Sequence, residues 1–459
     1  MIRPPASRSF ARALLAAVAW LPAAVAAGAD RPNILLIVAD DLGWADVAYH
    51  GGRVATPNID RLAKTGVELD AHYVQPVCTP TRTALMTGRY PGRFGPQALA
   101  PSNLRALPPG TETLASALRS VGYTTHMAGK WHLGSRQEWG PKQYGFDHSY
   151  GSLNGAVDPW GHLYRKGPYA RTWHRDGVVY DEEGNATELV ARQSAKWIRE
   201  AKGPWLVYVP FHAVHIPVDA PDEYKKLHEG RKFYDDPKMD ESYHRFAAFI
   251  SQLDAKVGEL VAAVDASGAR DNTLIVFTSD NGGLHSGANA YISQVPPTPV
   301  LSSNLPLRGQ KDLLYEGGIR VPACVNWPAK LAPRKLLAPL HAVDWMPTLA
   351  KLVGYQSASD LKWDGLDAWP LLSGAAADPA PRTLYIAHRR GHVLRHGDWK
   401  LIAFANGRSE LYNIAADPYE TADRAAAEPA KLAELKALLD GMRAKDVDKL
   451  PADLEGIPA

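Results

Sequence analysis

The chain has 459 residues, of which 46% are hydrophobic and 22% charged, and it contains only two cysteines. This composition is ordinary for a globular protein, and the length suits one large domain with a smaller one, or two to three average domains. The 51 basic and 49 acidic side chains give a net charge of +2. Without a basic excess or a Lys/Arg-rich block, we expect no nucleic-acid partner.

The N-terminus has the pattern of a signal peptide. Arg3, Arg8 and Arg12 precede the apolar run Ala13–Ala27, which ends in small residues. The run is short for a bilayer span, so we expect a cleaved signal at 1–27 and an exported, periplasmic or secreted protein, with a retained anchor as the alternative. No later stretch is suited to a stable membrane span. Cleavage takes three of the 51 basic side chains and leaves 48 against 49 acidic ones, a net charge of −1.

Four apolar segments each stop abruptly in charged or metal-binding side chains. Continuous apolar runs suit strands that are buried on both faces, so these segments predict a mostly parallel sheet covered by helices. The four segments are Asn33–Gly43 with Asp40 and Asp41, Tyr123–Gly134 with Lys130 and His132, Trp205–His215 with His212 and His215, and Thr273–Gly283 with Asp280 and Asn281.

Helical patterns alternate with these strands and indicate an α/β fold. Thr56 and Pro57 suit the N-cap and first turn of a helix that Gly66 ends. Further amphipathic patterns cover 113–122, 188–201 and 243–264.

The carboxyl ends of the four strands should meet at one edge of the sheet, where α/β folds bind their ligands. Carboxylate and amide oxygens there select a hard cation such as Ca²⁺ or Mg²⁺. Lys130 and Lys311 stand close to histidines and an arginine, which suits an anion. A cation, two lysines and an arginine in one pocket imply a sulfate or phosphate ester as substrate. The oxygen ligands are Asp40, Asp41, Asp280 and Asn281.

Cys78 precedes Pro80 and Arg82 in a Thr/Pro/Arg cluster that Gly88 ends. Pro80 favours a first helical turn, so Cys78 should lie just before a helix N-terminus, where backbone N–H groups favour an anion. One alternative is a disulfide with Cys324. Another is a low-pKa thiolate of the tyrosine-phosphatase kind, although those enzymes place five residues between Cys and Arg, and here there are three.

The segment Cys78–Arg82 resembles the Cys-X-Pro-X-Arg signature of type I sulfatases, and Met86–Arg89 resembles its Leu-Thr-Gly-Arg half with Met in place of Leu. The sequences at 72–90 and 123–134 are most similar to the arylsulfatase B-like branch, which includes N-acetylgalactosamine 4-sulfatase. The resemblance covers nearly the whole mature chain and includes Asp40–Val47, Gly129–Gly134, Gly145–Asp147, His212–Pro217, Thr278–Gly283, Pro306–Pro322 and His396–Glu420.

The resemblance implies an alkaline-phosphatase-like α/β sandwich, with a large mixed, mostly parallel sheet between helices. A smaller C-terminal α+β subdomain should contain an antiparallel sheet and a closing helix at 428–445. We therefore expect a catalytic domain at 31–372, a turn-rich connector at 373–382 and the C-terminal subdomain at 383–459.

In that family a maturation enzyme, either the formylglycine-generating or an anaerobic type, oxidises the signature cysteine to formylglycine. The resemblance implies that one calcium ion is bound by the four oxygen ligands, with modified Cys78 close to it. Arg82 would hold the formylglycine, His132 would contact its hydrate and His215 would face the ester oxygen. The sulfate oxygens would be gripped by Lys130 and Lys311.

The implied reaction is hydrolysis of a sulfate monoester, carried by a small sulfated carbohydrate such as an N-acetylgalactosamine sulfate or a related polysaccharide fragment. One hydroxyl of the hydrated formylglycine attacks sulfur, and His215 or Lys311 protonates the departing alcohol. His132 then takes the proton of the second hydroxyl, which expels sulfate. Two loops are candidates for the substrate rim, Asp158–Gly177 and Leu284–Leu305.

Two other functions remain open on the residues. A phosphonate monoester or phosphodiester hydrolase can carry the same signature on the same scaffold. A non-catalytic, exported binding protein could retain the pocket without turnover.

Overall fold

The computed structural model of the chain describes Met1 and residues 31–458, with gaps at 286–292, 294, 296–298 and 377–380. The predicted signal peptide, apart from Met1, lies outside the described residues. Parts of the predicted connector and of the later rim loop lie outside them as well. Arg31–Ala459 forms a compact unit of its own. Within the described part of the chain, no helix has the length and apolar character to cross a membrane.

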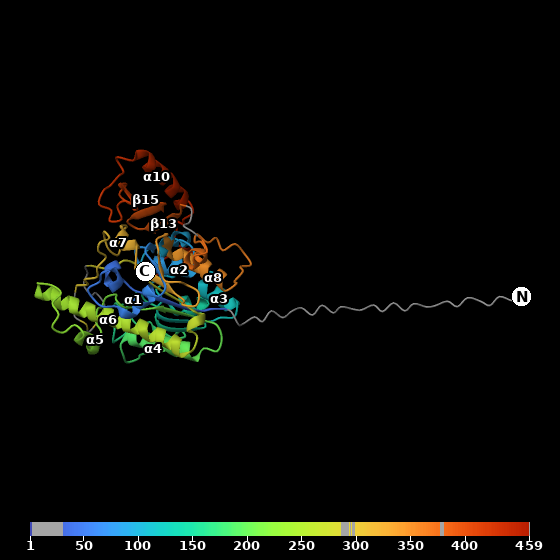
Figure 1. Cartoon of the computed structure of the whole chain (residues 1–459), viewed down its shortest axis with the longest axis vertical. Coiled ribbons are helices and arrows are strands. Elements are labelled where there is room, and N and C mark those ends of the chain that lie inside the picture. The colour runs from blue at the N-terminus through green and yellow to red at the C-terminus, as the bar shows by residue number, and fades with distance from the viewer. Residues whose placement is uncertain (2–30, 286–292, 294, 296–298, 377–380, 459) are drawn as a thin grey trace. The chain divides into compact units, whose positions relative to one another are not determined.

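Ten of the described strands form one mixed sheet in the order β11-β2-β10-β9-β1-β8-β4-β5-β6-β7. Helices lie on both sides of this sheet (Figure 1). The middle strands β9, β1, β8, β4 and β5 run parallel, whereas β10, β6 and β7 are antiparallel to their neighbours. This confirms the predicted large, mixed and mostly parallel sheet. The strands are β1 Asn33–Ala39, β2 Val67–Leu69, β4 Thr124–Lys130, β5 His148–Ser152, β6 Trp173–Arg175, β7 Val178–Val179, β8 Trp205–Pro210, β9 Thr273–Ser279, β10 Ala323–Asn326 and β11 Arg334–Leu336.

Helices cover both faces of this sheet because its central strands are apolar on both sides. In β1, Ile34, Leu36 and Val38 pack with α2, α3 and α8, while Leu35 and Ile37 pack with α1, α4 and α6. The helices are α1 Pro57–Lys64, α2 Cys78–Thr87, α3 Leu114–Ser120, α4 Ala186–Glu200, α5 Asp222–Lys226, α6 Pro237–Ala266, α7 Glu316–Ile319, α8 Trp345–Leu352, α9 Trp369–Ser373 and α10 Pro429–Arg443.

The predicted elements correspond closely to observed ones. The four predicted strand segments contain β1, β4, β8 and β9, and the helical patterns contain α1 and α3 and overlap most of α4 and α6. The helix α6 begins earlier than the pattern at 243–264 indicated. Asp236 caps it there, since its side chain accepts hydrogen bonds from the backbone N–H groups of Lys238 and Met239.

The C-terminal part contains the predicted antiparallel sheet, with strands β13 Thr383–His388, β14 Gly391–His396, β15 Trp399–Phe404 and β16 Ser409–Asn413. The helix α10 contacts β14 and β15. The opposite face packs on a small apolar cluster with Leu314, which precedes α7, and Ile319, its last residue. A short parallel pair, β3 His72–Tyr73 and β12 Leu340–His341, lies apart from both larger sheets.

A buried ionic cluster joins this C-terminal sheet to α7. The Lys400 ammonium on β15 lies 2.9 Å from Glu316 Oε1 and 2.7 Å from Glu420 Oε1, and all three side chains are shielded from solvent. The Tyr73 hydroxyl donates to Glu316 Oε2. Removing one partner of such a cluster leaves a buried charge without compensation.

We therefore expect Lys400→Met to lower the free energy of unfolding by about 3–5 kcal/mol, because two buried carboxylates lose their cation. Chemical denaturation measures this change. The control is Lys431→Met, which removes a solvent-accessible pair with Glu434 and should cost about 0–1 kcal/mol. Equal stabilities of the two variants would contradict the prediction.

Candidate active site and metal centre

The four predicted polar clusters lie together at one edge of the sheet. Asp40 directly follows β1, Asp280 directly follows β9 and Lys130 is the last residue of β4. His212 and His215 follow β8. Because β9, β1, β8 and β4 are parallel neighbours, their carboxyl ends bring these side chains to the same place.

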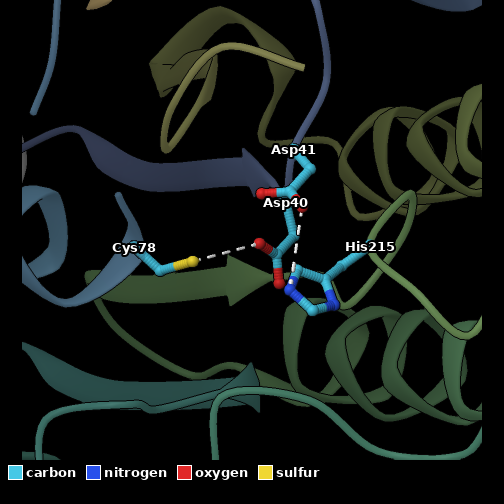
Figure 2. A group of neighbouring side chains, drawn as sticks. All are labelled: Asp40, Asp41, Cys78 and His215. Atoms are coloured by element: carbon cyan, nitrogen blue, oxygen red, sulfur yellow. Dashed lines mark hydrogen bonds and ion pairs between the residues drawn. The ribbon is translucent and has the colours of Figure 1, made fainter. Parts of the chain in front are cut away.

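Cys78 is the first residue of α2, whereas the sequence placed it just before the helix, and Gly88 ends that helix in the left-handed conformation at φ 69°. The Cys78 side chain is only 2% exposed. Its sulfur lies 3.7 Å from Asp40 Oδ1 and 3.6 Å from the Lys311 Nζ atom. Figure 2 shows the sulfur directed toward the Asp40 carboxylate, with the His215 ring beside Asp41.

The disulfide interpretation is wrong, because Cys78 and Cys324 are both free. Cys324 packs on the sheet face that α1 and α6 cover, whereas α2 packs against the other face. The thiolate interpretation also lacks support. Burial raises the pKa of Cys78 to about 12, so the thiol stays protonated at neutral pH.

Three buried cations are each paired with a carboxylate. Arg82 donates from Nη2 to Asp280 Oδ2 at 2.7 Å, and Lys130 Nζ lies 2.6 Å from Asp40 Oδ2. Lys311 Nζ lies 2.6 and 2.8 Å from the two Asp41 oxygens. Such pairing is what makes buried charges tolerable in a protein interior.

Arg82 has a second structural task. Its Nη1 donates to the backbone carbonyl of Lys130 at 2.6 Å, so this guanidinium ties α2 to the ends of β4 and β9. Direct contact between Arg82 and a modified residue 78 stays a prediction.

The adjacent carboxyls Asp40 and Asp41 have opposite pKa shifts. Burial and the neighbouring Asp280 raise the pKa of Asp40 to about 7. Burial also opposes ionisation of Asp41, but Lys311, His215 and Lys130 together outweigh burial and lower the Asp41 pKa below its usual range. Crowded carboxylates of this kind repel one another, and a divalent cation would relieve the repulsion.

The donor set fits a hard cation. Asp40, Asp41, Cys78 and His215 offer atoms that all lie within 4.8 Å of one another. Asn281 is fully buried, and its Oδ1 atom has no hydrogen-bond partner among the described residues, although its Nδ2 donates to Asp41 Oδ1. A buried acceptor without a donor beside paired carboxylates suits an oxygen-coordinated ion.

His132 and His215 are both buried at the same site. His215 Nε2 lies 3.7 Å from Asp41 Oδ2, and the His132 carbonyl accepts a hydrogen bond from the Thr79 hydroxyl. Burial lowers the pKa of His215 to about 3 and that of His132 well below its usual range, so both rings are neutral bases. Burial acts against the charge on Lys311, but Asp41 raises the Lys311 pKa well above its usual value.

Two supporting residues were not predicted. One is Thr79, whose hydroxyl donates to the His132 carbonyl. The other is Gly155, which leaves space for the His132 ring, because a Cβ atom at position 155 would lie 2.4 Å from that ring. Neither position has a local sequence signal, since each contact joins segments far apart along the chain.

Comparisons with known proteins agree with this geometry. The sulfatase family model matches residues 32–355. Mouse (Mus musculus) arylsulfatase J is 31% identical over 88% of this chain and 74% of its own, and rat (Rattus norvegicus) N-acetylgalactosamine-6-sulfatase is 32% identical over 77% and 68%. The solved structure of Ps i-CgsB in complex with k-i-k-neocarrahexaose is 31% identical, with a TM-score of 0.81 over 91% of this chain and 94% of that one.

A family match over most of the chain, relatives above 30% identity and a cation-lined site at the strand ends all agree. The chain belongs to the sulfatase family of sulfuric ester hydrolases.

Proposed function

We propose that this sulfatase hydrolyses sulfate monoesters of a carbohydrate, using a formylglycine at position 78 and one bound calcium ion. The observation that carries the proposal is the place of Cys78. It lies buried at the N-terminus of α2, between the Lys311 ammonium and the Asp40 carboxylate. A helix N-terminus with adjacent cations favours an anionic group there.

The described side chains divide the chemistry among them. Lys130 and Lys311 bind sulfuryl oxygens, where negative charge grows during ester cleavage. Of the two candidates for protonating the departing alcohol, Lys311 holds a proton at neutral pH, because Asp41 raises its pKa. His132 is neutral and accepts the proton that must leave when sulfate is released.

The residues of the site suit both expected groups, the formylglycine and the calcium ion. A formylglycine would supply a hydrated aldehyde, whose two hydroxyls on one carbon provide a nucleophile and a route to sulfate release. Asp40, Asp41, Asp280 and Asn281 would hold the calcium ion, which would supply Lewis-acid stabilisation of negative charge. The preference for calcium over magnesium rests on the family resemblance, since oxygen ligands suit both ions.

A sulfated glycan is the favoured substrate class. Ps i-CgsB has been solved with a neocarrahexaose, and a matched relative is an N-acetylgalactosamine-6-sulfatase. In this chain, the predicted rim 158–177 lines a cavity of about 410 Å³ with Trp160, which is 39% exposed, and with the buried Trp173. An exposed aromatic face such as that of Trp160 suits a sugar ring.

The charges around that cavity favour an uncharged sugar unit. Asp181, Glu182 and Glu183 line it together with one cation, Arg171. Arg171 is already paired with Asp181. A second sulfate or a uronate would be repelled there, whereas sugar hydroxyls can donate to carboxylates.

Export and maturation are part of the same proposal. We propose that residues 1–27 direct the chain to the periplasm or the outside, and that a formylglycine-generating or anaerobic enzyme converts Cys78. A sulfatase that binds without turnover would be revealed by the kinetics below, and one that prefers phosphonate esters by comparing kcat/KM on an aryl sulfate and on a phosphonate monoester.

We expect the peptide around Cys78, from protein purified from its native host, to be lighter by the difference between a thiol and an aldehyde. Cys78→Ala should lower kcat for an aryl sulfate by at least about 1,000-fold, because the nucleophile is lost. Mass spectrometry and steady-state kinetics measure these effects. The matched control is Cys324→Ala, which alters the other buried cysteine and should retain kcat. An unmodified thiol in an active enzyme would exclude formylglycine.

We expect a calcium chelator to abolish turnover and added Ca²⁺ to restore it, because the proposed ligands Asp40, Asp41 and Asp280 would lose the calcium ion that they share. Asn281→Ala should weaken Ca²⁺ binding by roughly 10–100-fold through loss of one oxygen ligand. Calorimetric titration of the metal-free enzyme measures the affinity without turnover. Asn272→Ala, at the start of β9 and away from the site, is the control. Unchanged affinity in Asn281→Ala would argue against this ligand set.

Trp160→Ala should raise KM for a sulfated oligosaccharide by about 2–12-fold, since an aromatic contact is worth about 0.5–1.5 kcal/mol. The KM for a small aryl sulfate should stay unchanged, because none of the residues that line the cavity belongs to the site around Cys78. Kinetics with both substrates, and Tyr419→Ala as an exposed aromatic control, measure the difference. Equal changes with both substrates would count against a sugar subsite at Trp160.

A further inference from the structure

The segment that carries Lys311 is attached to the C-terminal sheet at several points. Arg308 Nη1 donates to the Tyr412 hydroxyl at 3.0 Å and to the Glu420 carbonyl at 2.9 Å. Further along, Glu316 pairs with Lys400. The loop next to the catalytic edge is therefore held from the side of the C-terminal sheet.

The attachment nearest the active site is an ionic clamp on Asp312. The two residues that form the turn between β13 and β14 are Arg389 and Arg390. Arg389 Nη2 donates to both Asp312 oxygens at 2.7 Å, and Arg390 donates to Oδ2 at 2.8 and 2.6 Å. The Nε2 atom of buried His388 lies 3.2 Å from Asp312 Oδ1.

Asp312 also has an unusual backbone. Its φ angle of 69° lies in the left-handed region that few non-glycine residues adopt, and Asp tolerates this region better than most. Its N–H donates to the Pro76 carbonyl at 2.8 Å, two residues before Cys78. The preceding residue, Lys311, donates its own N–H to the Gly283 carbonyl at 3.2 Å. The backbone of Asp312 thus joins the lysine loop to the segment that leads into α2.

The clamp contributes little to stability by ordinary standards. The side chains of Arg389 and Arg390 are 60% and 47% exposed, and that of Asp312 is 25% exposed. Ion pairs this accessible to solvent are screened and weak. What the clamp does determine is the conformation of the residue next to Lys311.

We propose that Asp312 is a positioning residue for Lys311, held by the Arg389–Arg390 turn of the C-terminal sheet. The inference rests on the proposed function, in which Lys311 binds the sulfuryl group and protonates the leaving alcohol. A displacement of a catalytic group by about 1 Å can cost on the order of 100-fold in rate, so a clamp one residue away has kinetic consequences. The C-terminal sheet thereby becomes part of the catalytic unit.

A double-mutant cycle tests this role. Asp312→Asn keeps the shape and the tolerance of the left-handed backbone but removes the charge. In the wild-type background it should lower kcat/KM for an aryl sulfate on the order of tenfold, and in a Lys311→Ala background by less than about twofold, because its effect passes through Lys311. The double variant Arg389→Ala/Arg390→Ala should reproduce the tenfold loss, and Arg389→Lys/Arg390→Lys should recover part of it.

The control is Asp453→Asn, which breaks a C-terminal ion pair with Arg105 away from the site and should leave kcat/KM unchanged. Melting temperatures of Asp312→Asn and Asp453→Asn should match that of the wild type. Equal losses from Asp312→Asn in both backgrounds, or no loss in either, would overturn the proposal.

The affinity for inorganic sulfate, measured by calorimetry in the same four proteins, separates this inference from the proposed reaction. An inactive wild type whose sulfate binding still depends on Asp312 only when Lys311 is present would refute the proposed turnover and support the clamp. Full activity in the wild type with no effect of Asp312→Asn on rate or on sulfate affinity would support the proposed turnover and refute the clamp.

Discussion

The site depends on the mutual compensation of charges that are buried where the strands end. Asp40, Asp41 and Asp280 face Lys130, Lys311 and Arg82, one cation to each carboxylate. None of these side chains could be placed there alone, because the cost of transferring an isolated charge from water exceeds the stability of a whole domain. The balance also means that a divalent ion and an anionic ester can enter as a pair without leaving a large uncompensated charge.

The same pairs join distant parts of the chain. Arg82 belongs to α2, Lys130 to β4 and Lys311 to the segment before α7, while the carboxylates follow β1 and β9. The site therefore exists only when the sheet, α2 and the late segment are assembled. Folding and formation of the site are one event, and the C-terminal sheet takes part through Lys400 and Asp312.

The sequence was most informative where a local pattern has a direct structural meaning. An apolar run that ends in Asp40-Asp41 predicts a buried strand whose end meets other polar strand ends, and β1 is fully buried and ends beside β8 and β9. Pro80 and Gly88 likewise marked the helix that begins at Cys78. The antiparallel strands at the C-terminus followed from short apolar segments separated by turns.

Contacts between distant residues could not be predicted in this way. The clamp on Asp312 depends on two arginines almost eighty residues later, and neither segment has a sequence pattern that predicts contact with the other. The alternative of a Cys78–Cys324 disulfide failed for a related reason, because the number of cysteines says nothing about which face of the sheet each occupies. The short strands β6 and β7 were missed as well, since they are too brief to show a period.

The burial of Cys78 has a consequence for how the protein is made. A side chain that is 2% exposed at the start of a packed helix is closed to any modifying enzyme once the chain has folded. If Cys78 is converted as proposed, the modifying enzyme must act before the chain folds, and a chain that folds first keeps its cysteine. The specific activity of a preparation would then depend on the fraction of chains that were converted before they folded. Two samples of identical fold and purity could therefore differ in activity.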